Sequence, residues 1–211
     1  MDKEVTIEND AQRQRLIAAL KKSIEEDCAG GRAFLDSKVA SGEAKGIPPK
    51  LMKVLRANID AREAVYKKII EGLPKAGLPM TAEDYFTRII FSFATAGIKE
   101  DPVKKEYTTL VLGLIPPERI PPEILKAMGP PPEGHGVAGM ITIPLQDLSH
   151  EELEAIDARS KTVSRLFNVA FTDFYVAASG KDKINVHAPD YRRFTDTVNE
   201  LLGLNGPRQG H

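Results

Sequence analysis

The stretch SHEELEAIDARSKTVSRLFNVAFTDFYVAAS, residues 149–179, contains neither proline nor glycine and is followed directly by Gly180. A helix of this length extends roughly 45 Å at 1.5 Å per residue, whereas the mean globular helix has about a dozen residues. Gly180 can adopt the left-handed conformation that commonly ends a helix. The stretch therefore predicts one long helix, around which the rest of the chain is organised.

Apolar or small side chains recur along this stretch at alternating steps of three and four, which is the spacing of one helical face. Up to Arg165 the other faces carry charges, whereas apolar side chains also flank the stripe beyond it. We therefore expect the first half to lie on the surface and residues 166–178 to be nearly surrounded by protein. The remaining polar strip consists of Arg165, Asn168, Thr172, Tyr175 and Ser179.

The same repeat also fits a coiled-coil seam between two chains. Small residues at Ser160, Ala170 and Ala177 would make that seam weak. A core helix is therefore the favoured interpretation, and a dimer seam is the alternative.

Bulk composition indicates a soluble, cytoplasmic protein. The 211 residues carry a formal net charge of −1, so nothing in the total favours a polyanionic partner. The single cysteine, Cys28, excludes an intrachain disulfide and agrees with a reducing compartment. The polar N-terminus lacks the apolar core of a secretory signal. The most apolar segment, 85–98, contains Arg88 and is too short to span a bilayer.

Further helices are expected on both sides of the long one. Thr81 and Asp84 resemble a capping box that opens a helix over 81–96, apolar on most sides and, with 166–178, a candidate for the centre of the core. Gly30 and Gly31 are expected to end the first helix, because glycine is the usual residue after a helix. The other predicted helices are 10–28, 32–41, 49–71, 101–114 and 190–202.

The predicted fold is all-α: a single helical domain over 1–204, built as a multi-helix bundle around the long helix. Seven of the fifteen prolines lie between Pro116 and Pro132, which predicts a stiff crossover over 115–134. Residues 137–143 and 183–187 look extended and could form a minor two-stranded β ribbon, although such ribbons are marginal alone. The tail 205–211 is expected to be disordered.

Motifs for cofactors or metals are weak, and no cofactor or metal is predicted. Residues 134–139 match G-x-G-x-x-G, but a dinucleotide site needs a strand before the glycines and a helix after them. No helix carries an internal Glu-x-x-His pair of the kind that builds di-iron sites. His135 and His187 flank the extended runs and could meet. Cys28 lies on an apolar stripe, which favours a buried structural thiol over a nucleophile.

Two charged residues in apolar surroundings are the best candidates for a site. Asp173 and Arg88 each need a partner or solvent, because an unpaired buried charge costs several kcal/mol. A structural ion pair or a surface strip is the simpler interpretation. The functional one is a ligand pocket between 81–96 and 166–179, where burial would raise the pKa of an acid without a cation. Its predicted lining residues are Asp173, Arg88, Tyr85, Asn168 and Tyr175.

Three functions are compatible with these observations. The favoured one is a non-catalytic helical binding or scaffold protein that contacts another protein or associates with itself; no catalytic group is predicted. The alternative is a ligand-binding protein or enzyme that uses the pocket described above. Nucleic-acid binding through Arg13, Arg15, Lys21 and Lys22 ranks third, because Glu25 and Glu26 balance these charges.

Overall fold

The computed structural model describes residues 4–98, 149–181 and 183–202, without the side chains of 151–153, 155–157, 159 and 160. The predicted all-α class is confirmed: no strand occurs in the described part, where Ile7 and Met80 form an isolated antiparallel bridge. The elements in chain order are α1 (Asp10–Ser23), the π-helical turn η1 (Ile24–Ala29), α2 (Gly30–Ala40), the 3-10 turn η2 (Glu43–Gly46), α3 (Pro49–Gly72), the 3-10 turn η3 (Leu73–Lys75), α4 (Ala82–Thr95), α7 (His150–Ser179) and α8 (Pro189–Leu201).

The long helix forms as predicted. α7 runs unbroken over His150–Ser179 and ends at Gly180, whose φ of 68° is left-handed. Its second half is largely buried, with Leu166, Phe167 and Ala170 each at most 2% exposed. On the predicted polar strip, Asn168 is exposed. The apolar flanks beyond Arg165 therefore mark the segment that other helices cover.

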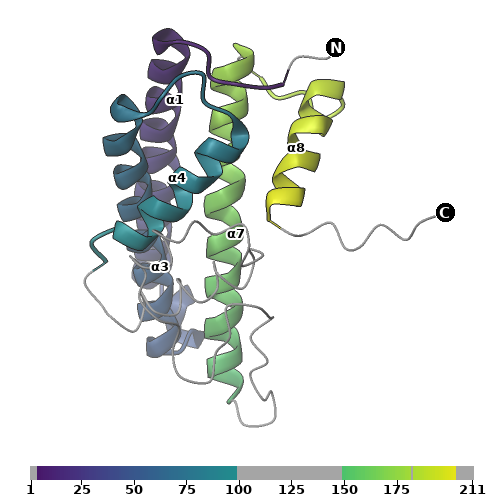
Figure 1. The fold of residues 1–211 in the computed structure, drawn as a ribbon. Helices are drawn as coiled ribbons and strands as arrows, with labels where there is room; N and C mark the ends of the chain where they lie inside the picture. The colour runs from purple at the N-terminus through teal and green to yellow at the C-terminus, as the bar shows by residue number, and fades with distance from the viewer. Residues whose placement is uncertain (1–3, 99–148, 182, 203–211) are drawn as a thin grey trace, which may run out of the picture.

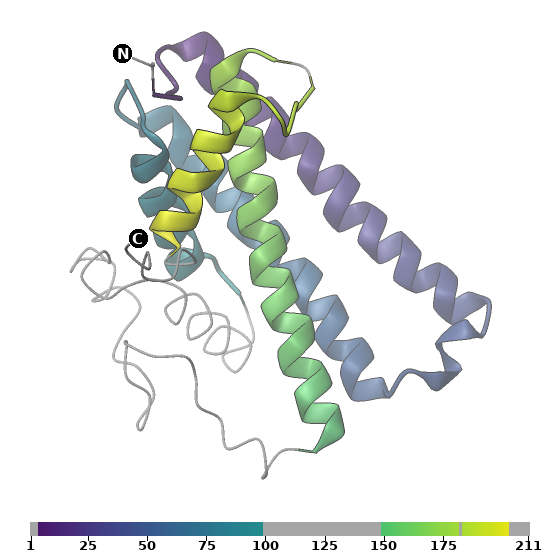
Figure 2. The same ribbon diagram turned by 90° about the vertical axis from the view of Figure 1, so that its right-hand side faces the viewer.

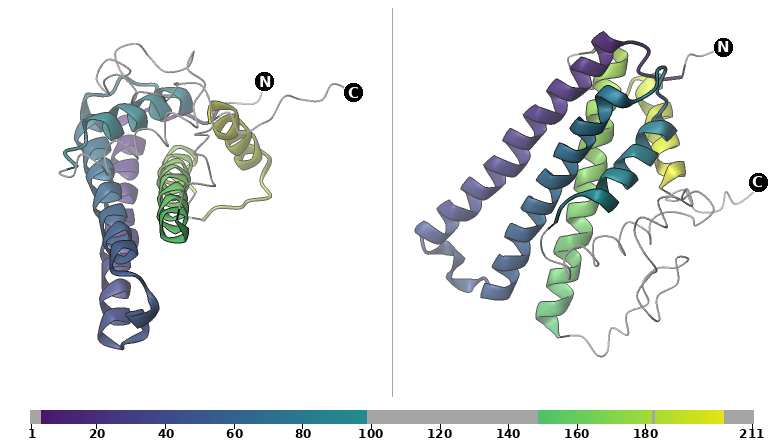
Figure 3. Two further views of the ribbon diagram at one scale, coloured as in Figure 1. Left: turned by 90° about the horizontal axis from the view of Figure 1, so that it is seen from below. Right: turned by 60° about the vertical axis from the view of Figure 1, so that its left-hand side comes forward.

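Three long helical segments lie side by side and define the shape of the molecule (Figure 1). α1 and α3 both pack against α7, and α4 packs on α3. Figure 2 shows α8 crossing α7 near its C-terminal end. The hairpin of α2 and the start of α3 extends away from α8 (Figure 3). The bundle thus has a thick end, where α4 and α8 add cover, and a thinner arm.

The first two predicted helices are in fact one continuous rod, so the prediction that Gly30 and Gly31 end the first helix is wrong. Gly30 has φ −60° and ψ −41°, which is ordinary right-handed helix. Glycine in a helix costs only about 1 kcal/mol relative to alanine. Packing of the buried Leu35 and ion pairs from Arg32 to Asp60 and Glu63 on α3 offset that cost.

The expected core is confirmed around α4. The Thr81 hydroxyl accepts a hydrogen bond from Asp84 N at 3.1 Å while the Asp84 carboxylate accepts one from Thr81 N, which completes the predicted capping box. Tyr85, Phe86 and Ile89 are at most 3% exposed. The rings of Tyr85 and Phe86 pack on phenylalanine rings of α7, which makes the contact between α4 and α7 predominantly aromatic.

Near the end of α7 one prediction is confirmed and another is corrected. Tyr175, which lies in the segment expected to be nearly surrounded by protein, is fully buried, because α8 covers it and places the Tyr191 ring edge-on with centroids 4.9 Å apart. Residues 183–187 form a bend and a turn rather than a strand. The Asn185 side chain accepts a hydrogen bond from His187 N at 3.0 Å, which stabilises the turn.

Several predicted features lie outside the described residues. They are the helix 101–114, the proline-rich crossover 115–134, the glycine motif 134–139, the extended run 137–143, His135 and the tail 205–211. The meeting of His135 with His187 therefore stays a prediction.

Candidate functional site

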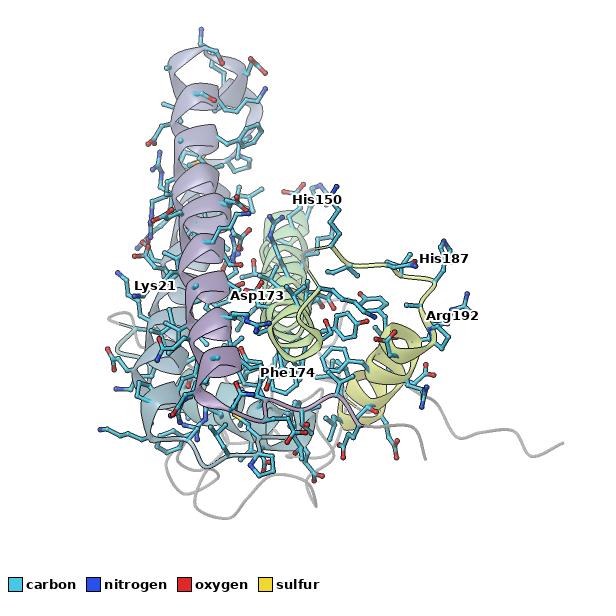
Figure 4. All side chains as sticks on the ribbon, turned by 90° about the horizontal axis from the view of Figure 1, so that it is seen from above. Lys21, His150, Asp173, Phe174, His187 and Arg192 are labelled. Atoms are coloured by element: carbon cyan, nitrogen blue, oxygen red, sulfur yellow. The ribbon has the colours of Figure 1, made fainter. Side chains whose placement is uncertain are left out.

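Asp173 lies on the side of α7 that faces α1, as Figure 4 shows. Its carboxylate accepts a hydrogen bond from the Ser23 hydroxyl at 2.8 Å. Burial raises the pKa of Asp173 to about 6; the Ser23 hydrogen bond lowers it, Glu26 raises it and Lys22 lowers it. Asp173 is therefore a half-buried acid whose charge is only partly compensated.

Tyr85 lies in the core beside Asp173. Its ring stacks on Phe174 with centroids 4.9 Å apart. Its buried hydroxyl has no hydrogen-bond partner, and the same is true of Tyr66 on α3. Burial and then the Asp173 carboxylate raise the pKa of Tyr85. Two tyrosine hydroxyls and one carboxylate thus meet where α1, α3, α4 and α7 converge.

Arg88 lies elsewhere, at the end of α3. Its guanidinium Nη1 donates to the Gly72 carbonyl oxygen at 3.1 Å. A cation at the C-terminal end of a helix is favourable, because the last carbonyls are unpaired and the dipole is negative there. Burial lowers the pKa of Arg88, and Asp84 and Tyr85 raise it. One of the partners that Arg88 needs is therefore a helix end.

Tyr175 and Asn168 lie away from both places. The Tyr175 hydroxyl donates to Asp190 at 2.9 Å, and Lys181 Nζ lies 2.6 Å from the same carboxylate. Asn168 is exposed. The structure thus brings together Asp173 and Tyr85, with Arg88 one turn from Tyr85 on α4 but hydrogen-bonded to the end of α3, and places Tyr175 and Asn168 elsewhere. A ligand role for these five residues stays a prediction.

A buried charge cluster, which the sequence analysis did not identify, links three helical segments. Asp27 on η1 lies 2.9 Å from Arg62 Nε on α3, and Arg165 on α7 contacts its second carboxylate oxygen. Asp27 and Arg62 are 7% and 8% exposed. The Asp27 carboxylate oxygens and Arg62 Nε are buried without a hydrogen bond of good geometry, so the contact between the two side chains is an ion pair. The cluster ties α3 and α7 to the π-helical turn.

One sequence signal could have identified this cluster. Arg62 lies on the apolar stripe of α3, three residues after Ile59 and four before Tyr66, and all three are buried. The position of Asp27 has no comparable signal, because a π-helical turn inserts a residue and changes which side chains face inward. The turn buries Asp27 and Cys28 together.

Cys28 is a buried thiol, as predicted. It is fully buried, and burial, the largest cause, raises its pKa to about 11. Arg62 lowers that pKa and Asp27 raises it. The thiol is therefore protonated near neutral pH and is a poor nucleophile.

Two open pockets lie at the surface, outside the contact between α4 and α7. The larger, about 480 Å³, is lined by Ala76, Gly77, Leu78, Pro79, Met80, Asp84, Thr87, Arg88 and Phe91. The smaller, about 150 Å³, lies between α8 and the N-terminal segment and is lined by Glu4, Val5, Ala82, Asp190, Arg193, Phe194 and Thr197.

Within the described part of the chain, no three or more histidine, cysteine, aspartate or glutamate side chains gather in a way that could hold a metal ion. No helix within 4–98, 149–181 and 183–202 combines the length and the apolar character that crossing a bilayer needs. Comparison with protein-family models, with curated proteins and with solved structures gives no match.

Proposed function

We propose that this protein is a non-catalytic helical binding protein that associates with a second copy of itself through α2. The observation that carries the proposal is the outward face of α2, where an exposed aromatic ring lies in a stripe without charge. Phe34 is 59% exposed, the most exposed large apolar side chain of the described residues. The stripe, at spacings of three and four, consists of Gly30, Ala33, Phe34, Ser37 and Ala40, all exposed.

The stripe is complementary to itself. A two-fold contact requires that one surface supply both a protrusion and the hollow that receives it. In the proposed contact Phe34 supplies the protrusion, and the small residues Gly30, Ala33 and Ser37 of the second copy leave room for it. Small residues also let two helix backbones approach closely. An antiparallel pair of α2 helices would bury both Phe34 rings, which is favourable by about 25 cal/mol per Å² of apolar surface.

The charges beside the stripe already have partners within the chain. Arg32 pairs with Asp60 and Glu63, and Arg56 on α3 pairs with Asp36 at 2.6 Å. Lys38 Nζ lies 5.4 Å from the centre of the Phe34 ring, over its face. A second copy therefore does not need to neutralise these groups.

The contact is short, so the dimer should be weak. Stable interfaces bury about 800 Å² on each partner, and three turns of one helix supply less. We expect a dissociation constant on the order of 10–100 µM.

Sedimentation velocity over a concentration series tests the proposal. Wild type should shift from monomer to dimer as concentration passes the dissociation constant. Phe34→Asp should stay monomeric, because each copy would bury an unpaired carboxylate. Val186→Asp is the matched control: Val186 is 55% exposed but lies in the turn after α7, so this variant should dimerise like wild type. A monomeric wild type, or a Phe34→Asp dimer of undiminished affinity, overturns the proposal.

Nucleic acid is not among the proposed partners. Arg13 donates to the Ala76 carbonyl oxygen at 2.9 Å, so one of the four basic residues considered for that role supports the fold. Arg15 lies against Gly180, where an added Cβ would come within 3.0 Å of its guanidinium. The proposal includes a cytoplasmic location, which the buried, protonated Cys28 supports.

A further inference from the structure

The larger surface pocket is built from one face of α4 and the turn that precedes it. Asp84, Thr87, Arg88 and Phe91 follow one another at steps of three, one and three, so they share a helical face opposite the buried rings. The segment 76–80 forms the other wall. The pocket has a volume of about 480 Å³, which lies within the usual range for small-molecule sites, about 300–1,000 Å³.

Arg88 is held in this pocket by a close approach to the backbone. Its Nη1 hydrogen bond to the Gly72 carbonyl oxygen fixes one edge of the guanidinium. A Cβ at Gly72 would lie 3.0 Å from that Nη1, so the absence of a side chain there permits the contact. Arg88 Nε is buried without a hydrogen-bond partner, and no carboxylate among the described residues forms an ion pair with Arg88. Asp84 acts on Arg88 from one turn away on α4 but is not in ion-pair contact with it, so the partly desolvated cation still favours an anionic ligand.

The rest of the lining is mainly apolar. Phe91 is 47% exposed, unlike the other phenylalanines of α4, Phe86 and Phe93, which are buried. Leu78 is half-buried and Pro79 is exposed on the facing wall. These side chains offer an apolar surface one helical turn away from the Arg88 charge.

Asp84 limits the charge that the pocket accepts. One of its carboxylate oxygens accepts hydrogen bonds from Thr81 N and Oγ1, both at 2.9 Å. The Asp84 carboxylate therefore caps the start of α4, and its negative charge also lies at the wall of the pocket. Arg88 balances one negative charge on a ligand, and Asp84 repels a second one.

We propose that this pocket binds a small apolar monocarboxylate, with the carboxylate on Arg88 and the apolar group against Phe91, Leu78 and Pro79. The site shares no residue with the α2 stripe, so it is independent of the proposed self-association. A carboxylate is the planar acceptor that a guanidinium binds best, through two parallel hydrogen bonds.

Titration of the full chain with 3-phenylpropanoate, followed by amide NMR spectra, tests the ligand class. Saturable shifts should map to 76–91. The neutral amide of the same acid and the dianion phenylsuccinate should each bind about tenfold more weakly, because one lacks the charge and the other carries a second. Equal affinity for the amide, or shifts that map elsewhere, overturns the proposal.

Variants test the assigned residues. Arg88→Gln keeps most of the side-chain length and should weaken 3-phenylpropanoate binding about tenfold. Because Arg88 also supports the end of α3, Phe91→Ser provides a second test that leaves the Gly72 contact in place, and it should weaken the acid and the amide alike. Arg192→Gln, an exposed arginine on α8 (Figure 4), is the matched control and should bind like wild type. Wild-type affinity in a folded Arg88→Gln or Phe91→Ser variant contradicts the assignment.

Discussion

Asp173 makes the stability of the fold depend on pH. Its pKa rises from 3.8 to about 6 on folding. The native state therefore binds more protons than the unfolded chain in this window, and stability falls as pH rises from about 4 to 6. The groups that face it are Ser23, Lys22 and Glu26 from the α1 rod, with Tyr66 from α3 and Tyr85 from α4. The difference corresponds to at most about 3 kcal/mol.

Asp173→Asn removes this ionisation while its amide oxygen can still accept from Ser23. At pH 7.5 the variant should be more stable than wild type by about 1–3 kcal/mol, and near pH 4 the two should converge. Urea unfolding of both proteins at several pH values measures the difference. A gap that widens as pH falls would show that the ionised form is the stabilised one.

Asp27 has the opposite role, because its charge is matched by two arginines. Asp27→Asn leaves the buried Arg62 without its counter-charge and should destabilise the protein by about 3 kcal/mol. Asp36→Asn breaks an exposed pair with Arg56 and should cost less than about 0.5 kcal/mol. Urea unfolding at neutral pH compares the two variants. Equal losses in the free energy of unfolding would show that burial does not decide how much these ion pairs contribute.

At the residue scale, the sequence identified the charged residues that lie among apolar side chains, but it did not predict which groups these residues contact. Asp173 and Arg88 have apolar neighbours along their own helices, and both are half-buried. Tyr175 could not be placed, because α8 covers it and that contact depends on the path of the chain after Gly180. Its hydroxyl is consequently paired with Asp190 rather than with a ligand site.

Helices formed where the sequence predicted them when caps, prolines and apolar periodicity agreed with the packing of neighbouring helices. The cap at Thr81, the prolines before α3 and the periodicity of α8 each predicted an observed helix. Gly30 and Gly31 failed as a stop signal because contacts with α3 outweigh a cost of about 1 kcal/mol for each glycine. The π-helical turn has no local signal of this kind, which is why the Asp27 cluster was not predicted.

A glycine comparison tests the continuous rod. Gly30 has right-handed helical angles and nothing nearer than 3.9 Å to an added Cβ. Gly30→Ala should therefore stabilise the protein by about 0.5–1 kcal/mol. Gly180→Ala should destabilise it by about 1–2 kcal/mol, because its φ of 68° is left-handed. Thermal unfolding at low protein concentration measures both; destabilisation by Gly30→Ala would indicate a break in the rod.

Burial is distributed unevenly over the whole molecule. The rings of α4, α7 and α8 gather at one end, where Phe174 and Phe194 stack with centroids 5.9 Å apart. At the other end α2 packs on α3 and its adjoining turns, and Phe34 and Val39 are more than half exposed. Local unfolding is easiest where few apolar contacts must be broken. The arm that carries the proposed contact should therefore be the less stable part of the bundle.

Hydrogen exchange can test both the difference in local stability between the two ends of the bundle and the proposed dimer. At low concentration, amides of α2 should exchange at least about 100-fold faster than those of 166–178. At high concentration α2 should become protected, because the second copy stabilises only the states in which α2 is folded. Phe34→Asp should abolish the concentration effect and leave the difference in local stability itself. Concentration-dependent protection of α2 that persists in Phe34→Asp would instead place the association on another surface.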